Sequence, residues 1–166
     1  MNGVFIGRFQ PFHRGHLWVI ESVHSRFDRF QIGIGSSQYH HTSSNPFTFD
    51  ERKMMIQLVL DPHQISYECV GIPDIHDPPH WVEHVQSILG PIDAVVTNNP
   101  ETQALFAKED ILVISPGLYA DHRYSGKAIR ARIRENKPWK HLVPTPVAAY
   151  IESISGLSRI KNLSNP

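Results

Sequence analysis

The sequence predicts an α/β protein with a single doubly wound, Rossmann-like parallel sheet and helices on both of its faces. Two observations predict this fold class. Short segments rich in Val, Ile and Phe alternate with helical patterns along the whole chain, and their spacing is that of parallel βαβ units. The 166 residues are the length of one compact domain. We therefore expect one domain over residues 1–166, with a C-terminal helical segment at about 144–166 packed on it.

The expected strands are short apolar segments bounded by Gly, Pro or Asn. They occupy residues 3–6, 29–34, 65–72, 92–97 and 111–114. In an open parallel sheet, ligands bind beyond the carboxyl ends of the strands, where the strand order reverses. The loops in which we expect a site are those at residues 7–15, 35–47, 73–80, 98–100 and 115–124.

The expected helices lie between these strands and after the last one. The first is marked by apolar residues at helical spacing, which are Leu17, Ile20, Val23 and Phe27. Thr48 and Glu51 form a capping-box pattern, so the second helix should begin near Thr48 and include the apolar segment 54–60. The remaining helices are expected at residues 79–89, 99–107, 125–135 and 144–154.

Composition and charge exclude several classes of partner. Sixteen Lys and Arg residues balance 16 Asp and Glu residues, without a basic cluster, so we expect no nucleic-acid partner. No segment is long enough to span a membrane, and the first residues lack a signal-peptide pattern. Cys69 is the only cysteine, which excludes an intramolecular disulfide and agrees with a reducing compartment. We therefore expect a cytoplasmic protein with no membrane partner.

The loop after the first strand carries the most informative pattern, Gly-Arg-Phe-Gln-Pro-Phe-His-Arg-Gly-His over residues 7–16. Gly7 permits a tight turn, and Gly15 lets a ligand approach the start of the helix. His13 and His16 are three residues apart, so they face the same side at the entrance of a helix. The unpaired N–H groups and the dipole of that helix end favour a phosphate. An isolated histidine pair could equally be two solvated polar residues.

A second informative segment, Tyr-Ser-Gly-Lys-Ala-Ile-Arg, occupies residues 124–130 and should begin a helix. Lys127, Arg130 and Arg134 fall on one helical face, apart from the apolar face. Basic residues at a helix amino terminus oppose the helix dipole unless an anion binds there. Taken alone, the segment could also be a solvated charged face.

Together the two segments resemble a known family. Gly-x-Phe-x-Pro-x-His-x-Gly-His is similar to the signature of the HxGH nucleotidyltransferase superfamily, whose members transfer a nucleotidyl group from a nucleoside triphosphate and release pyrophosphate. The second segment resembles that superfamily's Ser-x-Thr-x-Ile-Arg signature, and it departs from it at Lys127, where the family has threonine. Neither a Walker-type loop nor a Gly-x-Gly-x-x-Gly pattern is present in the sequence, which disfavours kinases and dehydrogenases.

Further segments resemble the archaeal type of nicotinamide mononucleotide (NMN) adenylyltransferase over nearly the whole chain. They lie at residues 33–38, 45–52, 73–75, 81–82, 99–106 and 139–143. The resemblance implies that Trp81 stacks on the nicotinamide ring with Asp74 beside it, although a tryptophan on an amphipathic helix is also often a core residue. Pro78 stands where that family commonly has an asparagine, so one side-chain contact with the nicotinamide amide is lost.

The resemblance implies adenylyl transfer from ATP to NMN by direct in-line attack, giving NAD and pyrophosphate. The implied catalytic residues are His13, His16 and Arg130. The implied ATP-binding residues are Gly7, Arg8, Phe9, Gly15, Ser125, Gly126, Lys127 and Asn99. The implied NMN-binding residues are Trp81, Asp74, Gly35 and Ser36. The protein itself would hold no metal, Mg²⁺ would enter with ATP, and the chain would form a homo-oligomer.

Other interpretations stay open at the level of the sequence. A sister nucleotidyltransferase would use nicotinate mononucleotide, phosphopantetheine or FMN as the acceptor. A nucleotide-binding regulator would bind ATP or NAD without turnover, and Lys127 is the feature that keeps this interpretation open. His76, His80 and His84 could suggest a zinc site, but histidine spacing alone is a weak guide. The role of the adjacent His40 and His41 stays open as well.

Overall fold

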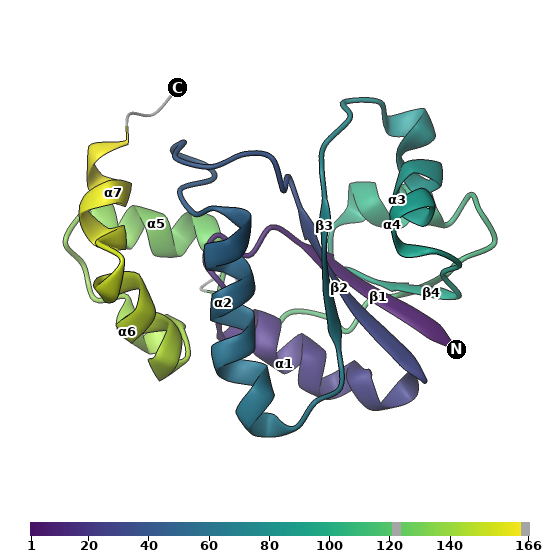
Figure 1. Cartoon of the computed structure of the whole chain (residues 1–166), viewed down its shortest axis with the longest axis horizontal. Coiled ribbons are helices and arrows are strands. Elements are labelled where there is room, and N and C mark those ends of the chain that lie inside the picture. Colours follow the sequence, from purple (N-terminus) through teal and green to yellow (C-terminus); the bar gives the residue numbers. More distant parts are fainter. Residues whose placement is uncertain (121–123, 164–166) are drawn as a thin grey trace.

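A five-stranded parallel sheet forms the centre of the computed structural model, which describes residues 1–120 and 124–163 (Figure 1). The strands are β1 (Asn2–Gly7), β2 (Arg29–Gly35), β3 (Glu68–Ile72), β4 (Ala94–Val96) and β5 (Leu112–Ile114). Their order is β3-β2-β1-β4-β5, and all neighbouring strands pair in parallel. This order reverses between β1 and β4 and confirms the predicted doubly wound, Rossmann-like sheet.

The helices cover both faces of the sheet (Figure 1). They are α1 (Arg14–Val23), α2 (Phe49–Leu60), α3 (Trp81–Leu89), α4 (Pro100–Phe106), α5 (Gly126–Arg134), α6 (Thr145–Ser153) and α7 (Gly156–Asn162). Short 3-10 helices occur at η1 (His24–Arg26), η2 (Asp61–His63), η3 (Pro78–His80) and η5 (Lys140–Leu142). Among these described helices, none combines the length and the apolar character that crossing a membrane requires.

Two separate hydrophobic cores lie on the two faces of the sheet. The larger core includes buried residues of α1, α2, α5, α6 and α7, and the smaller one includes buried residues of α3 and α4. α6 and α7 extend the larger core, because α6 packs against α2 and α7 packs against α5. The C-terminal helices therefore fix α5 relative to α2.

Several predicted boundaries differ from the observed ones. The strand predicted at 65–72 begins only at Glu68, because Gln64 adopts a left-handed conformation (φ 55°) and pairing with β2 starts at Glu68. The strand predicted at 92–97 is limited to Ala94–Val96, the residues that pair with β1. Phe27 is not part of the first helix: it is extended after η1, and its ring stacks on Phe30 with the centroids 5.6 Å apart.

The other helix predictions are largely confirmed. Thr48 caps α2 through the predicted capping box with Glu51, with its side-chain oxygen 3.1 Å from the Glu51 amide nitrogen. Asn99 and Ser125 each cap a helix with a side-chain oxygen alone, which accepts from the Thr102 amide in α4 and from the Ala128 amide in α5. The helix predicted at 144–154 is α6, and α7 was not distinguished from it, because the chain turns at Ser155 in a left-handed conformation (φ 57°). Residues 121–123 of the loop predicted to face the site lie outside the described residues.

Candidate active site

Two adjoining cavities open at the carboxyl edge of the sheet, where the strand order reverses. The first has a volume of about 410 Å³ and lies between the β1–α1 loop, the end of β4 and the start of α5. The second has a volume of about 520 Å³ and lies between the ends of β1 and β2, the β3–α3 loop and α4. Both are lined by Ile6, Gly7, Arg8, Thr97 and Asn99. The cavities therefore share a wall at the topological switch point.

The predicted site residues fall into these cavities as two groups. The first cavity is lined by His13, His16, Arg130, Gly7, Arg8, Phe9, Gly15, Ser125, Gly126, Lys127 and Asn99. The second cavity is lined by Trp81, Asp74, Gly35 and Ser36. The residues that the sequence associates with NMN thus lie in the second cavity, and those associated with ATP lie in the first, with Gly7, Arg8 and Asn99 lining both.

His13 and His16 form a reciprocal cap at the start of α1. The Nδ1 atom of His13 accepts a hydrogen bond from the His16 amide at 3.3 Å, and Nδ1 of His16 accepts one from the His13 amide at 3.2 Å. The two rings stack with their centroids 3.5 Å apart. Because each Nδ1 atom accepts a hydrogen bond, the proton of each neutral ring resides on Nε2.

Burial keeps both imidazoles neutral. It lowers the pKa of His13 to about 3. Burial, together with the neighbouring His13, holds the pKa of His16 well below its ordinary value of 6.5. At neutral pH the pair therefore offers two Nε2–H donors and no formal charge.

Arg130 supplies a buried cation to the first cavity. Its side chain is 5% exposed, and its Nη1 donates to the Gln10 carbonyl at 2.7 Å. Its Nε is buried without a hydrogen-bond partner among the described residues. Burial, then the nearby Arg8 and Arg134, lower the pKa of Arg130 to about 10, so it remains protonated at neutral pH. A buried guanidinium with a free donor favours an anionic ligand.

The β1–α1 loop and the first turn of α5, which carry the two sequence motifs, are in close contact at Gly15 and Gly126. A Cβ at Gly126 would lie 2.8 Å from the Gln10 carbonyl oxygen, and a Cβ at Gly15 would lie 3.0 Å from both the His13 ring and Tyr124. The first turn of α5 can therefore approach the β1–α1 loop only because these positions lack a side chain. The Ser125 hydroxyl accepts from the Ala128 amide at 3.1 Å as the cap of α5, which leaves its O–H as a donor.

The second cavity is shaped by contacts between the β2–α2 and β3–α3 loops. Ser36 donates to the Asp74 carboxylate at 2.7 Å. The Gln38 side chain brackets the backbone of Asp74, accepting from its amide at 3.0 Å and donating to its carbonyl at 2.9 Å. Tyr39 and His76 are joined by a hydrogen bond of 2.6 Å between the phenol oxygen and Nε2. These contacts hold the polar floor of the cavity.

Trp81 opens α3 and serves two roles. It lines the second cavity, and it packs against the smaller hydrophobic core. Pro78 lines the same cavity from η3 and provides no side-chain donor. The walls around Trp81 carry the carboxylates of Asp74, Asp77 and Glu101, and the described residues around the cavity include only one Arg or Lys, which is Arg8.

The described part of the chain contains no cluster of three or more His, Cys, Asp or Glu residues that could hold a metal ion. His80 instead contacts the Asp77 carboxylate at 2.7 Å, and His84 contacts the Pro73 carbonyl at 2.9 Å. Cys69 is half-buried in β3 and packs against the larger core, and burial raises the pKa of its thiol to about 12. His80 and His84 thus have partners within the protein, and Cys69 is a core residue.

Three residues with structural contacts around the cavities are not among the site residues expected from the sequence. Gln10 binds both the amide and the carbonyl of Phe47 with its side chain, at 2.9 and 3.0 Å. The Asn98 side chain holds Gly117 beside the first cavity: it accepts from the Gly117 amide at 3.0 Å and donates to the Gly117 carbonyl at 2.7 Å. Arg52 is completely buried. Most of their partners are backbone atoms distant in sequence, and no local pattern signals such contacts.

Comparison with known proteins identifies the family. The family model described as cytidylyltransferase-like matches residues 4–156. The chain belongs to this family. Among its relatives, the nicotinamide-nucleotide adenylyltransferase of Methanococcus maripaludis (strain DSM 14266) is 41% identical over 164 residues, which are 99% of this chain and 96% of the relative. The protein of the same name from Methanosarcina mazei is 43% identical over 160 residues, 96% of this chain and 92% of the relative.

Solved structures share the fold of this chain. The crystal structure of a bifunctional NMN adenylyltransferase/ADP ribose pyrophosphatase from Francisella tularensis matches with a TM-score of 0.76 and 21% identity. The match covers 95% of this chain and 52% of that chain, so the present chain corresponds to about half of the bifunctional protein. At this identity the match supports the fold alone.

Proposed function

We propose that the protein transfers the adenylyl group of ATP to the phosphate of NMN, forming NAD and releasing pyrophosphate. The observation that carries the proposal is the shared wall between two cavities, one with the buried Arg130 and two imidazole donors and one with Trp81. Two nucleotides bound in adjoining cavities can bring their phosphates together at such a wall. The names of relatives that are 41% and 43% identical to this chain support the same reaction.

The chemistry would proceed by direct displacement. An oxygen of the NMN phosphate attacks the α-phosphorus of ATP, a new P–O–P bond forms, and the bond from the α-phosphorus to the bridging oxygen breaks. Pyrophosphate leaves with the electron pair of that bond. Because the second ionisation of a phosphate monoester has a pKa of about 6, the attacking oxygen needs no general base at neutral pH.

The side chains around the first cavity would stabilise this transfer electrostatically. Arg130, Lys127 and Arg8 would balance the charge of the triphosphate, and Nε2–H of His13 and His16 would donate to phosphate oxygens as charge develops. We propose that Mg²⁺ enters as Mg-ATP and neutralises part of the triphosphate charge. The described lining residues of the first cavity include no carboxylate, so ATP itself would hold the ion.

The second cavity favours NMN over nicotinate mononucleotide. The nicotinamide ring of NMN is a pyridinium cation with a neutral amide, and nicotinate mononucleotide has a carboxylate in place of that amide. Asp74, Asp77 and Glu101 line this cavity and would repel that carboxylate. Trp81 offers an aromatic face to the cationic ring. Because Pro78 provides no donor, the amide must be recognised by other groups of the cavity.

The resemblance to NMN adenylyltransferases also leads us to propose a cytoplasmic homo-oligomer built from a single domain. Light scattering after size-exclusion chromatography would measure the number of copies in the particle.

The test is pyrophosphate release from Mg-ATP with NMN, nicotinate mononucleotide, phosphopantetheine or FMN as the acceptor. Release that depends on NMN, with NAD as the product, is the expected result. Release with another acceptor alone would keep the mechanism and change the substrate. If ATP bound but none of the four acceptors released pyrophosphate, the protein would be a nucleotide-binding regulator.

A further inference from the structure

Arg52 is a buried arginine that the proposed chemistry does not use. It lies in the first turns of α2, and its side chain is 0% exposed. All three guanidinium nitrogens donate to backbone carbonyls. The hydrogen bonds run from Nε to Thr48 at 3.2 Å, from Nη1 to Arg8 at 3.0 Å and Gly35 at 2.8 Å, and from Nη2 to Ser36 at 3.2 Å. One side chain thereby joins the start of α2 to the ends of β1 and β2.

Three of the four carbonyls that Arg52 binds belong to residues that line the cavities. Arg8 lines both cavities, and Gly35 and Ser36 line the second one. Phe9, which follows Arg8, and Ser36 both adopt left-handed conformations, with φ of 52° and 49°. Residues with a side chain adopt this conformation rarely, and it persists where surrounding contacts hold it. The contacts of Arg52 lie next to both of these turns.

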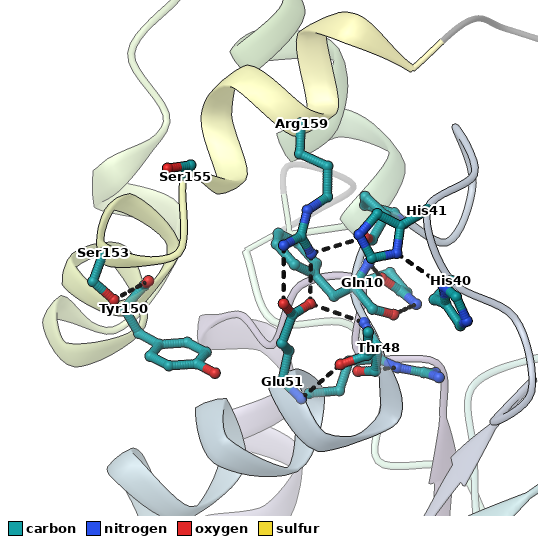
Figure 2. A network of polar contacts seen from close by, with 12 residues as sticks. Gln10, His40, His41, Thr48, Glu51, Tyr150, Ser153, Ser155 and Arg159 are labelled. Carbon is teal, nitrogen blue, oxygen red and sulfur yellow. Dashed lines mark hydrogen bonds and ion pairs between the residues drawn. The ribbon is translucent and has the colours of Figure 1, made fainter.

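Arg52 has no carboxylate partner among the described residues. The adjacent Glu51 binds Arg159 of α7 instead, at 2.6 and 3.0 Å, and also accepts from the Thr48 amide at 2.9 Å (Figure 2). Burial, then the nearby Arg8, lower the pKa of Arg52 to about 10, so it is a cation at neutral pH. An uncompensated positive charge therefore lies behind the wall that the two cavities share, where it favours phosphate.

We propose that Arg52 is a positioning residue that locks the turns after β1 and β2 in one arrangement, so that the two bound phosphates meet in line. This inference rests on the proposed function. Arg52 itself lines neither cavity, so the side chains that would contact each nucleotide remain present when Arg52 is replaced. The relative placement of the attacking oxygen and the α-phosphorus loosens, and the rate of transfer falls.

The test is steady-state NAD formation by Arg52→Lys and Arg52→Met. Lysine keeps the charge but cannot reach four carbonyls in three directions. We expect kcat of Arg52→Lys to fall about 100-fold, as for a displacement of about 1 Å, while the KM values for ATP and NMN stay within roughly threefold. Arg52→Met should also have a lower kcat, and its KM for NMN should rise because the positive charge is gone. A folded Arg52→Lys with kcat within about twofold of wild type would overturn the proposal.

Arg134→Lys is the matched control. Arg134 also donates to backbone carbonyls, those of Ser43 at 2.8 Å and Ile160 at 3.4 Å, and it lines neither cavity. Its replacement should lower the melting temperature while kcat stays within about twofold of wild type. An equal loss of kcat in both lysine variants would show that Arg52 matters only for stability, and would overturn the proposal.

Failure of the inference and failure of the proposed function are distinguishable. If the wild type forms no NAD, the proposed function fails; if the wild type and folded Arg52→Lys are equally active, only the role of Arg52 fails. Should circular dichroism show that Arg52→Lys is unfolded, arginine side-chain NMR of the wild type decides. Slow rotation about the Nε–Cζ bond of Arg52 with NAD bound is the expected result, and rapid rotation there would overturn the proposal.

Discussion

Acidification should destabilise this protein through the histidine pair at the start of α1. The pKa of His13 is lowered from 6.5 to about 3 by burial, so the folded protein does not bind the proton that the unfolded chain binds below pH 6.5. Stability is therefore fully present above this value and is lost as the pH falls through the window between 6.5 and about 3.

The size of this loss of stability near pH 5 depends only on the histidine pKa of the unfolded chain, because His13 of the folded protein stays neutral at that pH. pH 5 is about 1.5 units below the ordinary pKa of histidine. Each histidine that stays neutral in the folded protein therefore lowers the free energy of unfolding at pH 5 by about 2 kcal/mol relative to neutral pH. The pKa of His16 is lowered in the same direction, so His16 adds to the loss that His13 causes. The combined loss is a large part of the stability of a domain of this size.

Urea denaturation near pH 7.5 and pH 5 measures this effect, and His13→Asn isolates one half of it. Asparagine is a good helix cap and does not titrate, so it can replace Nδ1 as acceptor of the His16 amide. The variant should lose about 2 kcal/mol less than wild type on acidification. An identical pH dependence of the two proteins would refute the assignment of a buried, neutral imidazole at this position.

Three further substitutions test other parts of the structure. Gly126→Ala places a Cβ 2.8 Å from the Gln10 carbonyl, so it should destabilise by about 2 kcal/mol and raise the KM for ATP, measured by denaturation and kinetics. Glu101→Gln should raise kcat/KM for nicotinate mononucleotide several-fold relative to NMN, because one repelling charge is gone; an unchanged ratio would contradict the acceptor argument. Arg159→Met leaves the half-buried Glu51 unpaired and should cost about 2 kcal/mol, while kcat, assayed at low temperature, stays near wild type.

The sequence predicted the sheet and the grouping of site residues because both depend on local patterns. The apolar strand segments, the Thr48–Glu51 cap and the two motifs are contiguous in the chain, and parallel topology brings their loops to one edge. The boundaries of β3 and β4 were not predictable in the same way, because they depend on which residues of β1 and β2 remain available for pairing.

The contacts that complete the site could not be read from the sequence. Arg52 follows Glu51 on an ordinary-looking helix, and only the tertiary structure directs it to four carbonyls. The histidine pair was predicted to face one side, but its reciprocal capping was not, because histidine is an uncommon helix cap. The roles of the predicted site residues remain predictions that the experiments above test.

The reciprocal cap also bears on how the site treats transition-metal ions. Two imidazoles stacked 3.5 Å apart would ordinarily invite capture of zinc or nickel. A metal at Nε2 requires that the ring proton move to Nδ1, where it would point at a backbone N–H instead of accepting from it. The reciprocal cap therefore disfavours binding of zinc or nickel at Nε2, and both rings keep an Nε2–H group that can donate a hydrogen bond.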